Sequence, residues 1–132
     1  MRNKFPLIVF CCAVVLLGGC RDETLSAYGA ADKVWLLQSL NEADFKARAT
    51  LVFPEEGAIK GSAPCNDYSA SQTVPYPWFK AEEVLSTKRA CPELELEQAF
   101  FDALSTMTLS EVGPDLLILS NDEGQQMIFQ PE

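Results

Sequence analysis

The sequence contains no histidine, so it lacks the side chain that most often serves as general base for a serine or cysteine nucleophile. It has 10 Lys and Arg against 19 Asp and Glu, with a net charge of −9. Nucleic-acid binding needs clustered positive charge, so we expect no nucleic-acid partner. The sequence also has no internal repeat or low-complexity tract, and 132 residues support one domain.

The longest apolar run, residues 5–17, is too short to span a bilayer comfortably. It follows Arg2 and Lys4 and leads into L-G-G-C, which ends at Cys20. A charged start, an apolar run and small residues before a cysteine resemble a bacterial lipoprotein signal peptide with its lipobox. We predict that residues 1–19 are removed and that Cys20 carries the lipid. A retained anchor helix is the alternative.

The predicted cleavage removes two basic residues and no acidic one, so the mature chain is more acidic still. Attraction to anionic lipid is therefore not expected, and membrane attachment depends on the acyl chains. Arg21, rather than Asp, follows the lipidated position, which favours the outer membrane, facing the periplasm, over the inner membrane. Residues 20–32 are polar and show no periodicity, so we expect a lipidated tether there.

Five cysteines are present, but two lie in the predicted signal peptide and Cys20 is assigned to the lipid. Cys65 and Cys91 then remain together in an oxidising compartment, where we expect them to form a disulfide. Two separately buried thiols are the alternative. A zinc site is disfavoured because two thiols without histidine make an incomplete ligand set, and we expect no metal and no cofactor.

Alternation of apolar residues and turn signals predict a series of strands. Their inward-facing residues include Trp35, Leu37, Leu51, Phe53 and Ile59. The predicted strand ranges are 34–40, 47–53, 58–62, 68–73, 79–89, 116–120 and 126–129. In the fifth strand, Phe79, Ala81 and Val84 are predicted to point inward. Gly61 is predicted to lie where another backbone approaches closely.

One helix is predicted from Pro92, since proline suits the first helical position. Leu96, Phe100, Ala103, Leu104 and Met107 recur at helical spacing and form the face that must be buried. Glu93, Glu95 and Glu97 fit the positive end of the helix dipole; a calcium site is the less favoured interpretation. Strands in sequence with one late helix predict a single α+β domain, a curved antiparallel β-sheet with one helix packed on it.

Two motifs carry a resemblance to a known family: C-N-x-Y at residues 65–68 and T-K-x-A-C-P at residues 87–92. Further matches follow in order: Trp35-x-Leu37, Thr50-Leu51-x-Phe53, Gly61, Glu97 with Phe100 and Leu104, Leu117-x-Leu119, and Ile128-Phe129. With these, residues 33–132 resemble the META domain family, that of HslJ-like heat-inducible outer-membrane lipoproteins. The resemblance implies a compact domain acting in envelope stress or antibiotic tolerance rather than in catalysis.

Candidate binding residues are Tyr76 and Trp78, on a segment (residues 74–78) whose prolines favour an extended backbone, and Asn66 beside the predicted disulfide. Burial of Trp78 in the core is the alternative for the first pair. Satisfaction of local backbone groups is the alternative for Asn66. We expect a non-catalytic lipoprotein that binds an envelope protein or a small hydrophobic ligand. A purely structural, stress-protective lipoprotein is the second hypothesis, and a hydrolase is a distant third.

Overall fold

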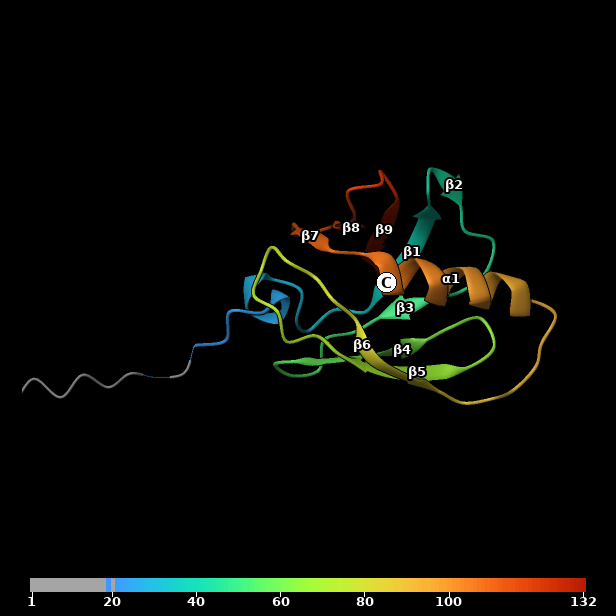
Figure 1. The fold of residues 1–132 in the computed structure, drawn as a ribbon, viewed down its shortest axis with the longest axis horizontal. Helices are drawn as coiled ribbons and strands as arrows, with labels where there is room; N and C mark the ends of the chain where they lie inside the picture. The colour runs from blue at the N-terminus through green and yellow to red at the C-terminus, as the bar shows by residue number, and fades with distance from the viewer. Residues whose placement is uncertain (1–18, 20) are drawn as a thin grey trace, which may run out of the picture.

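The computed structural model describes residue 19 and residues 21–132. Between residues 21 and 132 the chain forms nine strands, one α-helix and one short 3-10 helix (Figure 1). In chain order these are η1 (Leu25–Tyr28), β1 (Trp35–Leu40), β2 (Ala43–Asp44), β3 (Thr50–Leu51), β4 (Ala58–Ser62), β5 (Asp67–Ser71), β6 (Glu82–Ser86), α1 (Leu94–Thr106), β7 (Leu109–Val112), β8 (Leu117–Ser120) and β9 (Gln126–Pro131).

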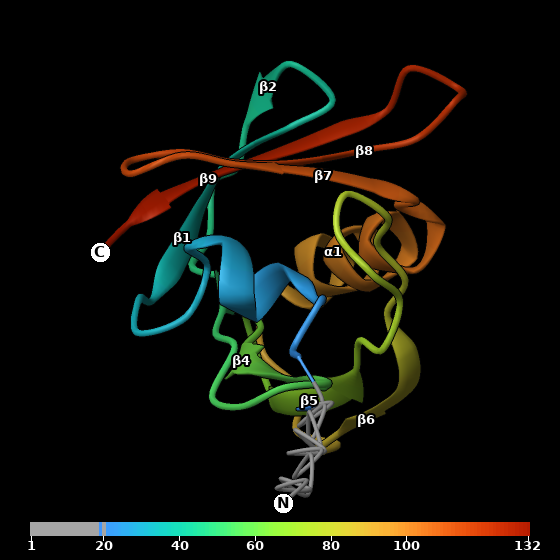
Figure 2. The ribbon, with the colours of Figure 1, turned by 90° about the vertical axis from the view of Figure 1, so that its left-hand side faces the viewer.

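All strands pair antiparallel, and they form two sheets. The larger sheet has the order β2-β1-β9-β8-β7, with β3 paired to β1 beside β2, and the smaller has the order β4-β5-β6. Figure 2 shows β7–β9 on one side of the interior and β4–β6 on the other. The single α+β domain predicted from the sequence is confirmed. The strands are divided between two sheets, however, because apolar alternation places side chains inward or outward but does not specify which strands pair.

The two sheets meet where β3 leads into β4. Val52, which directly follows β3, and Lys60 on β4 exchange two backbone hydrogen bonds, of 2.7 and 2.9 Å. A Cβ built on Gly61 would lie 2.1 Å from the backbone oxygen of Thr50. Only glycine allows this close approach, so the predicted role of Gly61 is confirmed.

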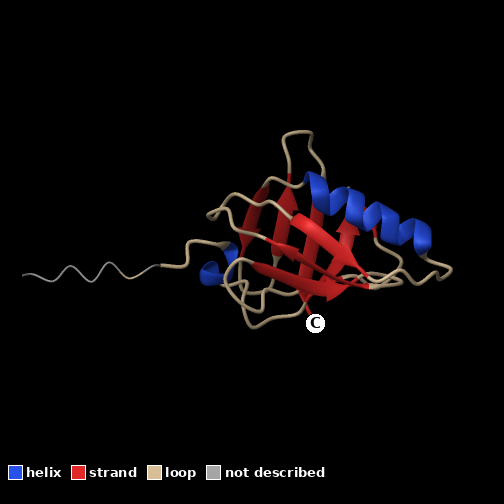
Figure 3. Ribbon diagram, turned by 60° about the horizontal axis from the view of Figure 1, so that its bottom comes forward, coloured by secondary structure: helices blue, strands red, loops and turns tan. Residues whose placement is uncertain are grey.

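The interior is filled by the inward faces of both sheets and by α1, which lies along one side of the strands in Figure 3. The predicted core residues of β1, β3 and β4 are buried, among them Trp35, Leu51 and Ile59. Phe100 on α1 packs edge-on against Tyr68 on β5, with ring centroids 5.5 Å apart. The helix begins at Leu94, two residues later than predicted.

The segment assigned to a tether is folded against the domain from Thr24 onward. Leu25 and Ala30 are fully buried, and the indole nitrogen of Trp35 donates to the Ala30 oxygen at 2.9 Å. Two isolated apolar residues give no periodic signal, so the sequence did not reveal that they close one end of the core. The core residues extend from Leu25 to Phe129, so residues 21–132 carry a complete core.

One strand was not predicted from the sequence, and one residue was wrongly predicted to point inward. Leu109–Val112 forms strand β7, which the sequence analysis left unassigned; its inward residue is the polar Ser110, so apolar alternation is absent. Val84, predicted to point inward, is exposed because β6 lies at an edge and Glu83 has a positive φ that breaks the alternation. Within the described residues no helix combines the length and the apolar character needed to cross a membrane.

Candidate functional site

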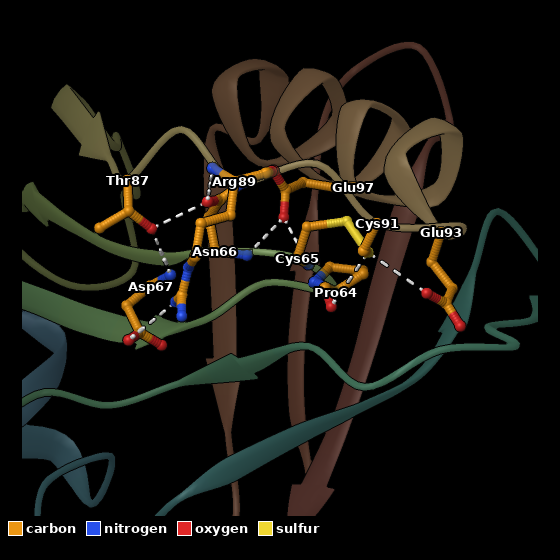
Figure 4. The surroundings of a disulfide bond; sticks show 9 residues. All are labelled: Pro64, Cys65, Asn66, Asp67, Thr87, Arg89, Cys91, Glu93 and Glu97. Atoms are coloured by element: carbon orange, nitrogen blue, oxygen red, sulfur yellow. Dashed lines mark hydrogen bonds and ion pairs between the residues drawn. A yellow bond between two sulfur atoms is a disulfide. The ribbon is translucent and has the colours of Figure 1, made fainter.

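The predicted disulfide links Cys65, before β5, to Cys91, before α1. Beside it, the carboxylate of Glu97 on the first turn of α1 reaches the turn between β4 and β5 (Figure 4). One Glu97 oxygen accepts from the backbone nitrogens of Cys65 and Asn66, at 2.7 and 2.9 Å, and the other from the Asn66 side-chain nitrogen at 2.6 Å. Glu97 thus joins α1 to this turn directly, and its exposed fraction is only 5%.

The hydrogen-bonding positions of the Asn66 side chain are also occupied. Its nitrogen donates to the Arg89 backbone oxygen at 2.9 Å as well as to Glu97, and its oxygen accepts from the Arg89 backbone nitrogen at 2.6 Å and the Thr87 hydroxyl at 2.9 Å. An amide has two donors and two acceptor positions, and all four are used here. Asn66 therefore holds the segment before α1 against β5, the structural alternative considered above, and has no hydrogen-bonding capacity left for a ligand.

From the sequence, Glu97 was interpreted as helix-terminal charge and as a match to the META pattern, and its central position in this network was not predicted. A signal was available: Glu97, Phe100 and Leu104 are spaced at i, i+3 and i+7, which places the carboxylate on the apolar face of the helix. Glu93 and Glu95 are exposed, as expected for charges near a helix N-terminus.

Two other polar groups help to fix the architecture. Burial raises the pKa of the Tyr68 hydroxyl, which donates to the Thr50 backbone oxygen at 2.7 Å. Slight desolvation raises the pKa of Asp22, but hydrogen bonds from Ser26 and Thr24 outweigh it and leave the pKa below its usual range. Asp22 thereby fixes the chain at the start of η1.

A cleft of about 300 Å³ lies beside the Asn66–Glu97 network, between α1 and the segment that precedes it. Leu94 and Phe101 give it apolar walls, and Leu94 is 48% exposed. Lys88 and Arg89 also line the cleft, and a guanidinium nitrogen of Arg89 lies 3.7 Å from a carboxylate oxygen of Asp67. The cleft therefore offers an apolar surface beside two cationic side chains.

The segment from residue 74 to 78 does not reach into the core. Trp78 is 57% exposed while its neighbour Phe79 is buried, so core burial of Trp78 is not observed. The backbone is a turn rather than extended, since the Trp78 nitrogen donates to the Pro75 oxygen at 2.9 Å. Tyr76 is half-buried and stacks on Tyr28, with ring centroids 4.5 Å apart.

Two sequence-based hypotheses remain, lipidation at Cys20 and a calcium site at the start of α1. Residues 1–18 and Cys20 lie outside the described residues, so the signal peptide and the lipidation stay predictions. Across residue 19 and residues 21–132, no group of three or more Asp, Glu, Cys or His could hold a metal ion. The acidic residues at the start of α1 are therefore not gathered into a calcium site.

A model of the META domain matches residues 29–132. This chain belongs to the META domain family. The resemblance seen in the sequence is thus confirmed.

Solved structures share the META fold of this chain. An NMR structure of a protein from Burkholderia xenovorans has 20% sequence identity and a TM-score of 0.65, covering 81% of this chain and 86% of that one. A crystal structure of a DUF4847 family protein from Bacteroides vulgatus has 12% identity and a TM-score of 0.60, covering 80% and 95%. No curated protein matches the chain. At these identities the likeness concerns the fold alone.

META membership supports an envelope-type domain, and the META domain is not a known enzyme family. The two motifs that best identify the META family, at residues 65–68 and 87–92, supply both the disulfide and Asn66. They meet at the disulfide and at the Asn66 side chain, which hydrogen-bonds to Thr87 and Arg89, and residues of both motifs line the cleft.

Proposed function

We propose that this chain is a lipid-anchored, non-catalytic domain of the bacterial envelope that binds a small hydrophobic ligand or an apolar side chain of an envelope protein. Membership of the META family supports the envelope, and the lipobox-like sequence before Cys20 supports the anchor. The wider role that fits these features is in envelope stress or antibiotic tolerance, with attachment to the outer membrane facing the periplasm.

The observation that carries the binding proposal is the exposed Leu94 at the cleft. Ligand sites are typically concave and mostly apolar, with a few polar groups that set orientation. Here Leu94 and Phe101 supply the apolar surface, while Lys88 and Arg89 suit a ligand that carries an acidic group. The disulfide and the Glu97 hydrogen bonds fix the walls, so little order has to be gained on binding.

The same network argues against hydrolysis at this site. Glu97 is the carboxylate that borders the cleft, and both of its oxygens accept hydrogen bonds from N–H groups. These donors would have to be displaced before Glu97 could act as a general base.

A purely structural, stress-protective role is the second candidate. It is favoured by the complete hydrogen bonding of the Asn66 amide, because stability alone then explains the motif residues.

The cleft can be tested with 1-anilinonaphthalene-8-sulfonate, an apolar fluorescent anion. We expect the mature chain to enhance its fluorescence and the Leu94→Glu variant to lose most of that enhancement, because a carboxylate then borders the apolar surface. Glutamate suits the first turn of a helix, so α1 should be preserved. Leu116→Glu, at a residue 38% exposed and outside the cleft, is the matched control. Equal enhancement by the wild-type chain and the Leu94→Glu variant would favour the structural role.

Lipidation is tested by replacing Cys20 with Ala in the full chain. We expect the wild type to be found with the outer membrane, and mass spectrometry to show a cleaved chain with acylated Cys20. The Cys20→Ala variant should accumulate as an uncleaved or unacylated precursor. Unmodified Cys20 in the mature wild-type chain would refute the anchor, and fractionation with the inner membrane would refute the sorting.

A further inference from the structure

Three aromatic side chains gather at one end of the domain. Tyr28 on η1 is 51% exposed and stacks on Tyr76, and Trp78 follows Tyr76 in the same turn. We call these three residues the aromatic patch. Large exposed aromatic groups seldom cluster on a surface that contacts only water, so the patch indicates an interaction surface.

The turn that carries Tyr76 and Trp78 is held in place by hydrogen bonds to residues 108–110. The Pro77 oxygen accepts from the backbone nitrogen of Ser110 on β7 at 2.7 Å, and from its hydroxyl at 3.0 Å. The Phe79 nitrogen donates to the Thr108 oxygen at 2.9 Å. These bonds fix the backbone of the turn and thus the position from which Tyr76 and Trp78 project.

The patch is also tied to the chain that comes from Cys20. The Tyr76 nitrogen donates to the Glu23 oxygen at 2.7 Å. Only three residues of chain, which extend over at most about 11 Å, connect Glu23 to position 20, so a lipid attached there would be held close to the patch. In Figure 1, η1 and the yellow-green loop between β5 and β6 lie at the end where the described chain begins, and the start of α1 lies at the opposite end.

From this position we infer that the aromatic patch contacts the surface of the bilayer and sets the orientation of the domain on the membrane. The inference uses the lipid anchor of the proposed function only for the position of Cys20. A lipid on Cys20 holds the patch close to the headgroup layer, where Tyr and Trp rings are favoured because they are apolar with one polar group. The domain is acidic, so the contact is with the interfacial region itself and does not depend on anionic lipid.

This assignment separates the two surfaces of the domain. Leu94 and the cleft lie at the start of α1, away from the anchored end, and stay open to the periplasm for a ligand or partner. Tyr76 and Trp78, which the sequence suggested as partner-binding residues, then face lipid instead.

The test attaches the chain to vesicles chemically, so that it does not depend on biological lipidation. With Cys65 and Cys91 in the disulfide, Cys20 is the free thiol of the chain from residue 20 onward, and it couples to a maleimide-bearing phospholipid in phosphatidylcholine vesicles. Trp35 is fully buried and gives a constant background. We expect coupling to shift the Trp78 emission to shorter wavelength, and phosphatidylcholine brominated at carbons 6 and 7 to quench it.

Two variants make the result specific. Trp78→Phe should remove both the shift and the quenching, leaving the Trp35 background. Trp78→Phe combined with Leu94→Trp moves the reporter to the opposite end of the domain and should show neither effect. Two results together would overturn the inference. In the coupled wild type, acrylamide would quench Trp78 emission as strongly as before coupling, and brominated lipid would quench it no more than in the Trp78→Phe, Leu94→Trp variant. The patch would then be open to a protein. A failure of lipidation in cells would appear separately, as unmodified Cys20 in the mass spectrum.

Discussion

Replacing Glu97 with Ala is expected to lower the free energy of unfolding by about 3 to 5 kcal/mol. The substitution removes the acceptor of two backbone N–H groups and one Asn66 N–H, and each buried donor left without a partner costs about 1 to 3 kcal/mol. Urea denaturation of the mature chain measures the loss. Glu95 lies on the same first turn of α1 but is exposed, so Glu95→Ala is the matched control. It should change the free energy of unfolding by no more than about 0.5 kcal/mol.

Glu97→Gln separates shape from hydrogen bonding. Glutamine fills the same volume and keeps one acceptor oxygen, but its NH₂ group has to face an N–H donor of Cys65, Asn66 or both. We expect a loss between those of Glu95→Ala and Glu97→Ala. Equal stability of the Glu97→Ala and Glu95→Ala variants would contradict the structural role assigned to the buried carboxylate.

Removing the disulfide by replacing both Cys65 and Cys91 with Ala is expected to cost about 3 to 4 kcal/mol. The two residues are 26 positions apart, and releasing a loop of that length increases the conformational entropy of the unfolded chain by this amount. The wild-type chain measured with reductant is the matched control and should lose about as much stability as the double variant. Thermal or urea unfolding with and without reductant gives the comparison.

Two outcomes would contradict the disulfide prediction. Quantitative alkylation of both Cys65 and Cys91 without reductant would show that they are thiols in the isolated protein. A double variant as stable as the oxidised wild type would show that the bond adds nothing to the Glu97 network. Because Cys65 takes part in both, the losses from the disulfide and from Glu97→Ala should not add exactly.

Much of the fold was predictable because its strands alternate clearly. Trp35 and Leu37 on β1, with Leu51 and Phe53 around β3, give apolar side chains at every second position, and all four are buried. The helical face through Phe100 and Leu104 was equally clear. In these elements the local pattern and the tertiary position agree.

The features that sequence analysis missed depend on buried polar groups. Ser110 occupies the inward position of β7 because Pro77 accepts its hydrogen bonds. Gln72 is buried because its side chain donates to the Val74 oxygen and accepts from the Lys80 nitrogen. Glu97 is buried for the same kind of reason. In the sequence such residues look solvated, because nothing local marks their hydrogen-bond partners; those of Ser110 and Glu97 even come from distant segments.

The position of β9 determines when this protein can fold. β9 pairs with β1 on one side and β8 on the other, so the first and last long strands lie next to each other, with Trp35 opposite Pro131. Contacts this far apart in sequence are slow to form, because a long loop has to close before they are made. The larger sheet therefore cannot be completed until residues 126–131 have left the ribosome. If the proposed signal peptide directs export, a chain that reaches the secretion channel before then carries an unfinished larger sheet, and such channels carry proteins in an unfolded form.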